Sequence, residues 1–128
     1  MANMPSDLLD AARSTLALTI EMPDIPHREA LFRCVTHQAY YAAYHTGLAH
    51  AIRSGFLLDE RPAGFGSHEA LWIWWFGNRR GEALIEGIGM DLKATRVNAD
   101  YRLRRTVTPA EAGSAIDEAE RLIGLLRA

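Results

Sequence analysis

The chain has 128 residues, the length of one domain that can bury a hydrophobic core without disulfides or metal. Its formal net charge of −2 excludes a strong overall attraction to nucleic acid, and its single cysteine, Cys34, excludes an intrachain disulfide. The N-terminal sequence MANMPSDLLD lacks the basic and apolar regions of a secretory signal, so we expect a cytoplasmic protein.

The first predicted helix spans about residues 6–20. Ser6 precedes an apolar stripe at helical spacing, formed by Leu9, Ala12, Leu16 and Ile20. Pro23 and Pro26 then interrupt the pattern, because each lacks an amide donor and biases the residue before it toward an extended conformation. A second helix is therefore expected to begin after Pro26.

A long helix is predicted from about residue 27 to residue 53, and the other helices are expected to pack around it. Between Arg33 and Arg53 the sequence contains no Asp, Glu, Lys or Arg, so no side of this helix is suited to ordinary solvation. The uncharged run is long enough to cross a membrane, but its three His, one Gln and two Thr argue against lipid. We expect a helix buried on most sides and no membrane segment.

The long helix also carries the polar residues that bear on function. A projection at about 100° per residue predicts one core-facing side, which comprises Leu31, Cys34, Gln38, Tyr41, Ala42, His45, Leu48, Ala49 and Ile52. Gln38, Tyr41 and His45 interrupt this side and form either a satisfied core network or part of a functional site. A row suited to lining a groove consists of Arg33, His37, Tyr40 and Tyr44. The small residues that allow close approach of a neighbour are Ala39, Ala43 and Gly47.

A third helix is predicted to begin at Ser67, which can cap it, and to carry the three tryptophans of the chain, Trp72, Trp74 and Trp75. Two interpretations of the tryptophans are open. They either fill the bundle or a dimer interface, or they form a platform on which nucleic-acid bases stack beside arginines such as Arg79. Burial of the rings distinguishes the two.

A fourth helix is predicted over about residues 82–103, with apolar residues on two sides and therefore two neighbours. Arg96 and Asp100 lie four residues apart in it, close enough to pair. The segment Thr108–Pro109–Ala110–Glu111 supplies a capping Thr, a Pro at the first helical position and a Glu at the third, so a fifth helix is predicted to about residue 126. Because no strand pattern occurs, the sequence predicts a single all-α domain.

Several kinds of chemistry are not expected from this sequence. His37 and His45 are eight residues apart, about 12 Å along a helix, which is too far to share a metal ion. No HExxH, P-loop, GxSxG or dinucleotide-binding pattern occurs, and Cys34 is expected to be a buried structural thiol. We therefore expect no metal and no cofactor. The segment 79–105, with seven basic and four acidic residues, is either a phosphate-binding surface or an ordinary solvated face.

Four segments together resemble a known family. The segment RCVTHQAYYAAYHTGLAH resembles the "RAYYAxFH" helix of the small stand-alone bacterial members of the HEPN-domain superfamily. Ser67-His68 resembles the Ser-His pair that opens the next helix of that family. RVNADY, from Arg96 to Tyr101, resembles its "R-x-x-A-D-Y" segment, and TPAEAGSAIDEAERLI resembles its closing helix. The resemblance covers about residues 27–125 in the same order and spacing.

The resemblance implies an up-and-down bundle of four to five helices, commonly a homodimer, with polar residues meeting in a cleft at or near the dimer interface. Many HEPN proteins are metal-independent RNases, often toxins paired with a minimal nucleotidyltransferase antitoxin, so the resemblance also implies a nucleotidyltransferase-type partner. The family's catalytic signature is an Arg followed four to six residues later by a His. The present sequence has Tyr101 after Arg96 and no such His.

Three hypotheses follow. The first is a HEPN-like module that binds a nucleotide, an RNA segment or a partner protein in a cleft, with candidate residues Arg33, His37, Tyr41, Tyr44, His45, His68, Arg96, Asp100 and Tyr101. The second is a metal-independent RNase in which His45 or His68 acts as general acid or base together with Arg96. The third is an interaction protein without a ligand, whose contact surface is the tryptophan cluster.

Overall fold

The computed structural model describes residues 4–23, 25–57, 66–78 and 82–127. Within these ranges the chain forms α-helices and no strand, and the helices are α1 (Pro5–Thr19), α2 (Ile25–Arg53), α3 (Ser67–Asn78), α4 (Glu82–Tyr101) and α5 (Pro109–Arg127). The all-α prediction is confirmed, and each predicted helix end lies within about two residues of the observed end. In the described ranges no helix is both long enough and apolar enough to span a membrane.

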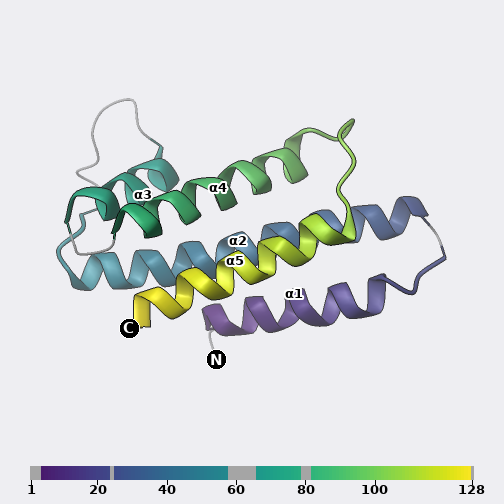
Figure 1. Cartoon of the computed structure of the whole chain (residues 1–128), viewed down its shortest axis with the longest axis horizontal. Helices are drawn as coiled ribbons and strands as arrows, with labels where there is room; N and C mark the ends of the chain where they lie inside the picture. Colours follow the sequence, from purple (N-terminus) through teal and green to yellow (C-terminus); the bar gives the residue numbers. More distant parts are fainter. Residues whose placement is uncertain (1–3, 24, 58–65, 79–81, 128) are drawn as a thin grey trace.

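α2 is the central helix, because it contacts each of the other four. α1 lies along one side of α2 and runs antiparallel to it (Figure 1). α4 and α5 also run antiparallel to each other, and α3 packs against both α4 and α2. The expectation that the chain is organised around the long helix is therefore confirmed.

Local sequence signals set two of the helix ends. α2 ends at Arg53, and Gly55, which follows it, has a φ of 105° in the left-handed region that glycine adopts without steric cost. The amide of Phe56 then donates to the carbonyl of Ala51 at 2.9 Å, which satisfies one of the last carbonyls of the helix. At the start of α5 the amide of Glu111 donates to Thr108 Oγ1 at 3.1 Å, as the Thr-Pro-x-Glu pattern predicts.

Tryptophan side chains fill the centre of the bundle. Trp72 is 0% exposed and Trp75 is 2% exposed. A Cβ at position 47 would lie 3.0 Å from the Trp72 ring, so the glycine there allows α3 to approach α2 closely. Ala39 and Ala43 are also fully buried, and the predicted small-residue side of α2 is confirmed. Burial therefore favours the packing interpretation of Trp72 and Trp75 over the base-stacking platform.

The predicted orientation of α2 is wrong. Of the side expected to face the core, only Ala42 is buried; Cys34, His45, Ala49 and Ile52 are exposed, and Leu31, Gln38, Tyr41 and Leu48 are half-buried. Cys34 is accordingly an exposed thiol. The buried side instead carries Phe32, Val35, Thr36, Ala39, Tyr40, Ala43, Tyr44 and Gly47. Because apolar or small residues surround this helix, their spacing does not distinguish its sides, and burial of the large tyrosine rings decides the orientation.

Candidate functional site

The side chains of Tyr40, Tyr44, His68, Trp72 and Arg96 meet where α2, α3 and α4 pack together, and we call them the aromatic cluster. Tyr40 and Tyr44 come from successive turns of α2, and His68 and Trp72 from successive turns of α3. The helical spacing of four residues places each pair on one face of its helix. The cluster includes Tyr44, His68 and Arg96, which the sequence predicted as site residues.

The hydrogen bonds of Tyr40 determine which nitrogen of His68 carries a proton. The indole nitrogen of Trp72 can only donate, and it donates to Tyr40 Oη at 3.2 Å. Tyr40 Oη also lies 2.7 Å from His68 Nδ1. Because the phenol is buried and already accepts a hydrogen bond from Trp72, its own hydrogen is satisfied by donating to Nδ1. Neutral His68 then carries its proton on Nε2, so that this nitrogen is a hydrogen-bond donor.

The surroundings of His68 favour the uncharged imidazole. Tyr44 stacks on the ring with a centroid distance of 4.0 Å and an interplanar angle of 20°. Burial lowers the pKa of His68 from its ordinary value of 6.5 to about 4, and the positive charges of Arg96 and Lys93 add to the effect. Burial also raises the pKa of Tyr40. At neutral pH both groups are therefore uncharged, and the hydrogen-bond chain from Trp72 to His68 is intact.

Arg96 brings a positive charge to the cluster. Its guanidinium carbon lies 5.4 Å from the ring centroid of Tyr40, 5.7 Å from that of Tyr41 and 5.9 Å from that of Tyr101. Its Nη1 donates to Asp100 Oδ2 at 3.3 Å, so the predicted pair is confirmed. The Nε atom of Arg96 is buried and has no hydrogen-bond partner among the described residues.

Asp100 connects Arg96 to the surface. Its Oδ2 atom also lies 2.9 Å from Nδ1 of His37, whose side chain is 46% exposed. A hollow of about 470 Å³ opens beside this pair, and it is lined by Arg33, Cys34, His37, Gln38, Ala99, Asp100 and Leu103. The Oε1 atom of Gln38 is buried and, like Arg96 Nε, lacks a partner among the described residues. Two buried polar atoms without a partner among the described residues thus lie in this region of α2 and α4.

A row of exposed or half-exposed rings runs along α2 next to the cluster. The ring centroids of His37 and Tyr41 are 4.6 Å apart, and those of Tyr41 and His45 are 5.8 Å apart. We call His37, Tyr41 and His45 the ring row. Tyr101, which is 72% exposed, also belongs to α4, and its ring contacts the guanidinium of Arg96. His45 is thus a surface residue beside the cluster and not the interior residue that the sequence predicted.

Arg33 does not belong to the cluster. Its guanidinium donates to the carbonyls of Ala99 at 2.8 Å, Leu103 at 3.3 Å and Arg105, all at or beyond the end of α4. It also pairs with Glu29 at 3.2 Å, and Glu29 accepts a hydrogen bond from the amide of the α4–α5 connection at residue 107. Its donors are directed at backbone and at Glu29, so Arg33 positions the end of α4.

Tyr40 and Trp72 belong to the aromatic cluster but are not among the predicted site residues. Both are aromatic residues on predicted helices, and Trp72 follows His68 by four residues, which was the available signal. The part of the basic segment that includes Arg79 lies outside the described residues. In the described ranges no group of three or more His, Cys, Asp or Glu side chains is arranged to hold a metal ion.

Comparisons with protein-family models, with curated proteins and with solved structures find no match to this chain. Its function is therefore inferred from the aromatic cluster, the ring row and the motif resemblance.

Proposed function

We propose that the chain is a HEPN-like helical module that binds single-stranded RNA on the surface formed by α2 and α4. The observation that carries the proposal is the position of Arg96, a buried member of the aromatic cluster whose guanidinium lies against the rings of Tyr41 and Tyr101. Arginine beside accessible aromatic rings is the combination that single-stranded nucleic acid uses, because the rings stack with bases and the cation attracts phosphate.

Exposure of the rings supports a single strand as the ligand. His37 and His45 are exposed, Tyr41 is half-buried and Tyr101 is 72% exposed, so their faces and edges can be reached by unpaired bases. Bases in a duplex stack on one another and do not offer these faces. Asp100 neutralises part of the charge of Arg96, so stacking is expected to contribute more to affinity than phosphate contacts, with a modest dependence on salt.

The geometry counts against the alternative in which His68 catalyses RNA cleavage. A general base needs a free lone pair, but Nδ1 of His68 accepts from Tyr40 and Nε2 carries the proton. With a pKa of about 4, the imidazolium that a general acid needs is scarce at neutral pH. His45 contacts the rings of Tyr41 and Tyr44, and no carboxylate within the described ranges forms a hydrogen bond with it. Binding is therefore the proposal that we retain.

The motif resemblance supports two further parts of the proposal. HEPN-like proteins are commonly homodimers, and we propose that two copies of this chain associate and that a nucleotidyltransferase-type protein is the partner in a toxin–antitoxin pair. Sedimentation velocity of the purified chain tests the dimer. Co-expression with the product of an adjacent gene of that class, followed by affinity purification of the complex, tests the partner.

Fluorescence anisotropy with labelled oligo(U) and oligo(A) of about 12 nucleotides tests RNA binding directly. The double variant Tyr41→Ala/Tyr101→Ala is expected to weaken binding by about thirtyfold or more, because two stacking contacts are lost and each is worth roughly 1–3 kcal/mol. Arg96→Gln is also expected to weaken binding. Arg13→Gln, which changes an exposed arginine of α1, is the matched control and should bind like the wild type.

The same experiment includes outcomes that contradict the proposal. A folded Tyr41→Ala/Tyr101→Ala protein with wild-type affinity would show that the two rings do not bind RNA, and would exclude the proposed stacking surface. Tighter binding to a duplex of the same sequence than to the single strand would show that shape, not stacking, is recognised. Shortening of the RNA on a denaturing gel, retained after removal of divalent ions and abolished by His45→Ala, would restore the RNase alternative.

A further inference from the structure

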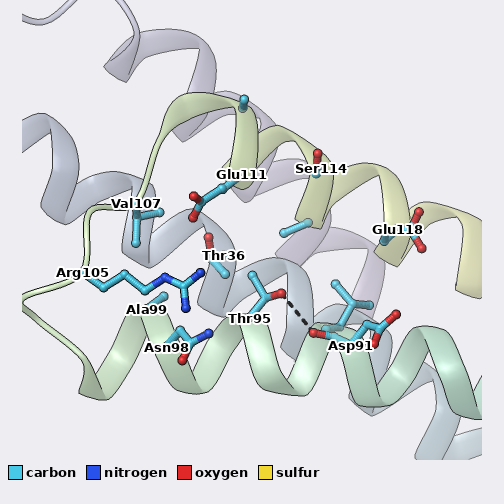
Figure 2. Close-up of a pocket in the computed structure, with 13 residues that line it drawn as sticks. Thr36, Asp91, Thr95, Asn98, Ala99, Arg105, Val107, Glu111, Ser114 and Glu118 are labelled. Carbon is cyan, nitrogen blue, oxygen red and sulfur yellow. Dashed lines mark hydrogen bonds between the residues drawn. The ribbon is translucent and has the colours of Figure 1, made fainter.

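A second cavity lies on another side of α4, between α4 and α5. It has a volume of about 450 Å³, which is within the range of small-molecule sites. Thr36 of α2 forms part of its wall, and Thr95 and Asn98 of α4 face Ser114 of α5 across it (Figure 2). Leu92, Ala99, Val107, Ala110 and Ala115 supply its apolar lining. None of these residues belongs to the aromatic cluster or the ring row.

Charged side chains occupy the two ends of this cavity. Arg105 and Glu111 lie at the end where α4 leads into α5, and the guanidinium of Arg105 extends inward toward Thr36 and Thr95 (Figure 2). Asp91 and Glu118 lie together at the opposite end (Figure 2). Because α4 and α5 are antiparallel, Asp91 of α4 is expected to lie opposite a residue further along α5, and Glu118 is such a residue.

These charges do not neutralise one another. Among the described residues neither the guanidinium of Arg105 nor the carboxylates of Asp91 and Glu111 form an ion pair, and Glu118 makes only a 3.9 Å contact with Arg121. One cation and three carboxylates give the cavity a net negative charge. The cavity therefore suits a ligand that carries more positive than negative charge and that presents its carboxylate to Arg105.

Two residues of α2 hold the backbone around Arg105 in place. Arg33 donates to its backbone carbonyl, and Glu29 accepts from the amide of Val107, so the connection that carries Arg105 is fixed to α2 at two points. A guanidinium on a fixed backbone binds a carboxylate with less loss of conformational entropy than one on an unconstrained loop. The cavity thus has the features of a preformed polar site.

We propose that this cavity binds a free basic amino acid, such as lysine or arginine. The ligand carboxylate pairs with Arg105, its α-ammonium faces Glu111, and its side-chain cation lies between Asp91 and Glu118. Four residues of α4, or about 6 Å of helix rise, separate Asp91 from Thr95, and about 10 Å separate it from Asn98. An extended lysine or arginine is long enough to cover the rise of about 6 Å between Asp91 and Thr95, toward which the guanidinium of Arg105 extends, and its methylene groups pack against the apolar lining.

Titration calorimetry and ¹H–¹⁵N NMR with defined probes test the proposal. L-Lysine and L-arginine are expected to bind and to shift the amide signals of residues 91–99 and 105–118. Cadaverine, which is lysine without its carboxylate, and 6-aminohexanoate, which lacks the α-ammonium, are each expected to bind about tenfold more weakly or not at all.

Variants test whether the charged residues at the two ends of the cavity contribute to amino-acid binding. Arg105→Gln and the double variant Asp91→Asn/Glu118→Gln are each expected to lower the affinity for L-lysine by about tenfold or more. Arg104→Gln, which changes the neighbouring exposed arginine, is the control and should leave the affinity unchanged. All these side chains except Glu118 are exposed, so the variants are expected to fold. No shift of the cavity signals with L-lysine or L-arginine up to about 10 mM would overturn the proposal, as would equal affinity for cadaverine or unchanged binding by Arg105→Gln.

Discussion

The buried phenol of Tyr40 and the imidazole of His68 are joined by a hydrogen bond of 2.7 Å that links the middle of α2 to the first turn of α3. The same phenol accepts from Trp72, whose ring fills the centre of the bundle. One hydroxyl group therefore satisfies two partners on α3, and its removal leaves both without their hydrogen bonds.

Tyr40→Phe is expected to lower the free energy of unfolding by about 1–3 kcal/mol, because the indole N–H of Trp72 becomes a buried donor without an acceptor. Urea denaturation followed by circular dichroism measures the change. Tyr101→Phe is the matched control, since Tyr101 is 72% exposed, and its stability should equal that of the wild type. Equal stability of Tyr40→Phe and Tyr101→Phe would mean that the hydrogen-bond chain does not form in solution.

The pKa of His68 predicts a loss of stability in acid. Folding lowers this pKa from 6.5 to about 4, so the native state disfavours the protonated form that the unfolded chain adopts readily. The contribution is complete above pH 6.5 and is lost as the pH falls from 6.5 to about 4. Since solvent screens a partly exposed group, we expect this contribution to be on the order of 1–2 kcal/mol.

Denaturation of the wild type and of His68→Gln across this pH range measures the contribution. Glutamine still offers an oxygen to Tyr40 but does not titrate, so the variant is expected to lose less stability than the wild type on acidification. An NMR titration of the His68 ring should have its midpoint near pH 4. Parallel stability curves for the two proteins, or a midpoint close to 6.5, would contradict the burial of this imidazole.

Arg33→Met is expected to destabilise the end of α4. The substitution keeps an apolar stem but removes the donors to the carbonyls of Ala99 and Leu103, at a cost of about 2 kcal/mol. Hydrogen exchange should accelerate in residues 102–107. In contrast, Arg13→Met removes exposed ion pairs with Asp10 and Glu120 and should cost less than about 1 kcal/mol. Similar effects of the two substitutions would exclude the capping role of Arg33.

The sequence predicted the helices well because their boundaries depend on local signals. Pro23 between α1 and α2, the glycine at position 55 and the capping threonine at position 108 act within a few residues of their own positions, although α2 begins at Ile25 and not after Pro26 as predicted. The Arg96–Asp100 pair was predictable for the same reason, since four residues on one helix are neighbours whatever the rest of the chain does.

The arrangement of the site was less predictable because it depends on contacts between distant segments. Tyr40 and His68 are 28 residues apart in the chain, and Arg33 is 66 residues from Ala99. Nothing near Arg33 in the sequence indicates that backbone carbonyls of α4 occupy its donors. The orientation of α2 was missed for a related reason: its spacing suits several orientations, and only packing against the other four helices selects one.

Gly89 of α4 provides a test of that packing. A Cβ at this position would overlap the ring of Trp72, which is fully buried and has no room to move. Gly89→Ala is therefore expected to destabilise the protein by about 1–3 kcal/mol, although alanine favours a helix by up to about 1 kcal/mol over glycine.

Gly87→Ala, two residues earlier on the same helix, is the matched control, because a Cβ there has no neighbour within 4 Å. Its stability should rise by about 0.5–1 kcal/mol. Urea denaturation of the two variants and the wild type should thus rank Gly87→Ala first, the wild type second and Gly89→Ala last. If Gly89→Ala were as stable as Gly87→Ala, α4 would not lie against Trp72, and the assembly of Arg96 with the aromatic cluster would have to be abandoned.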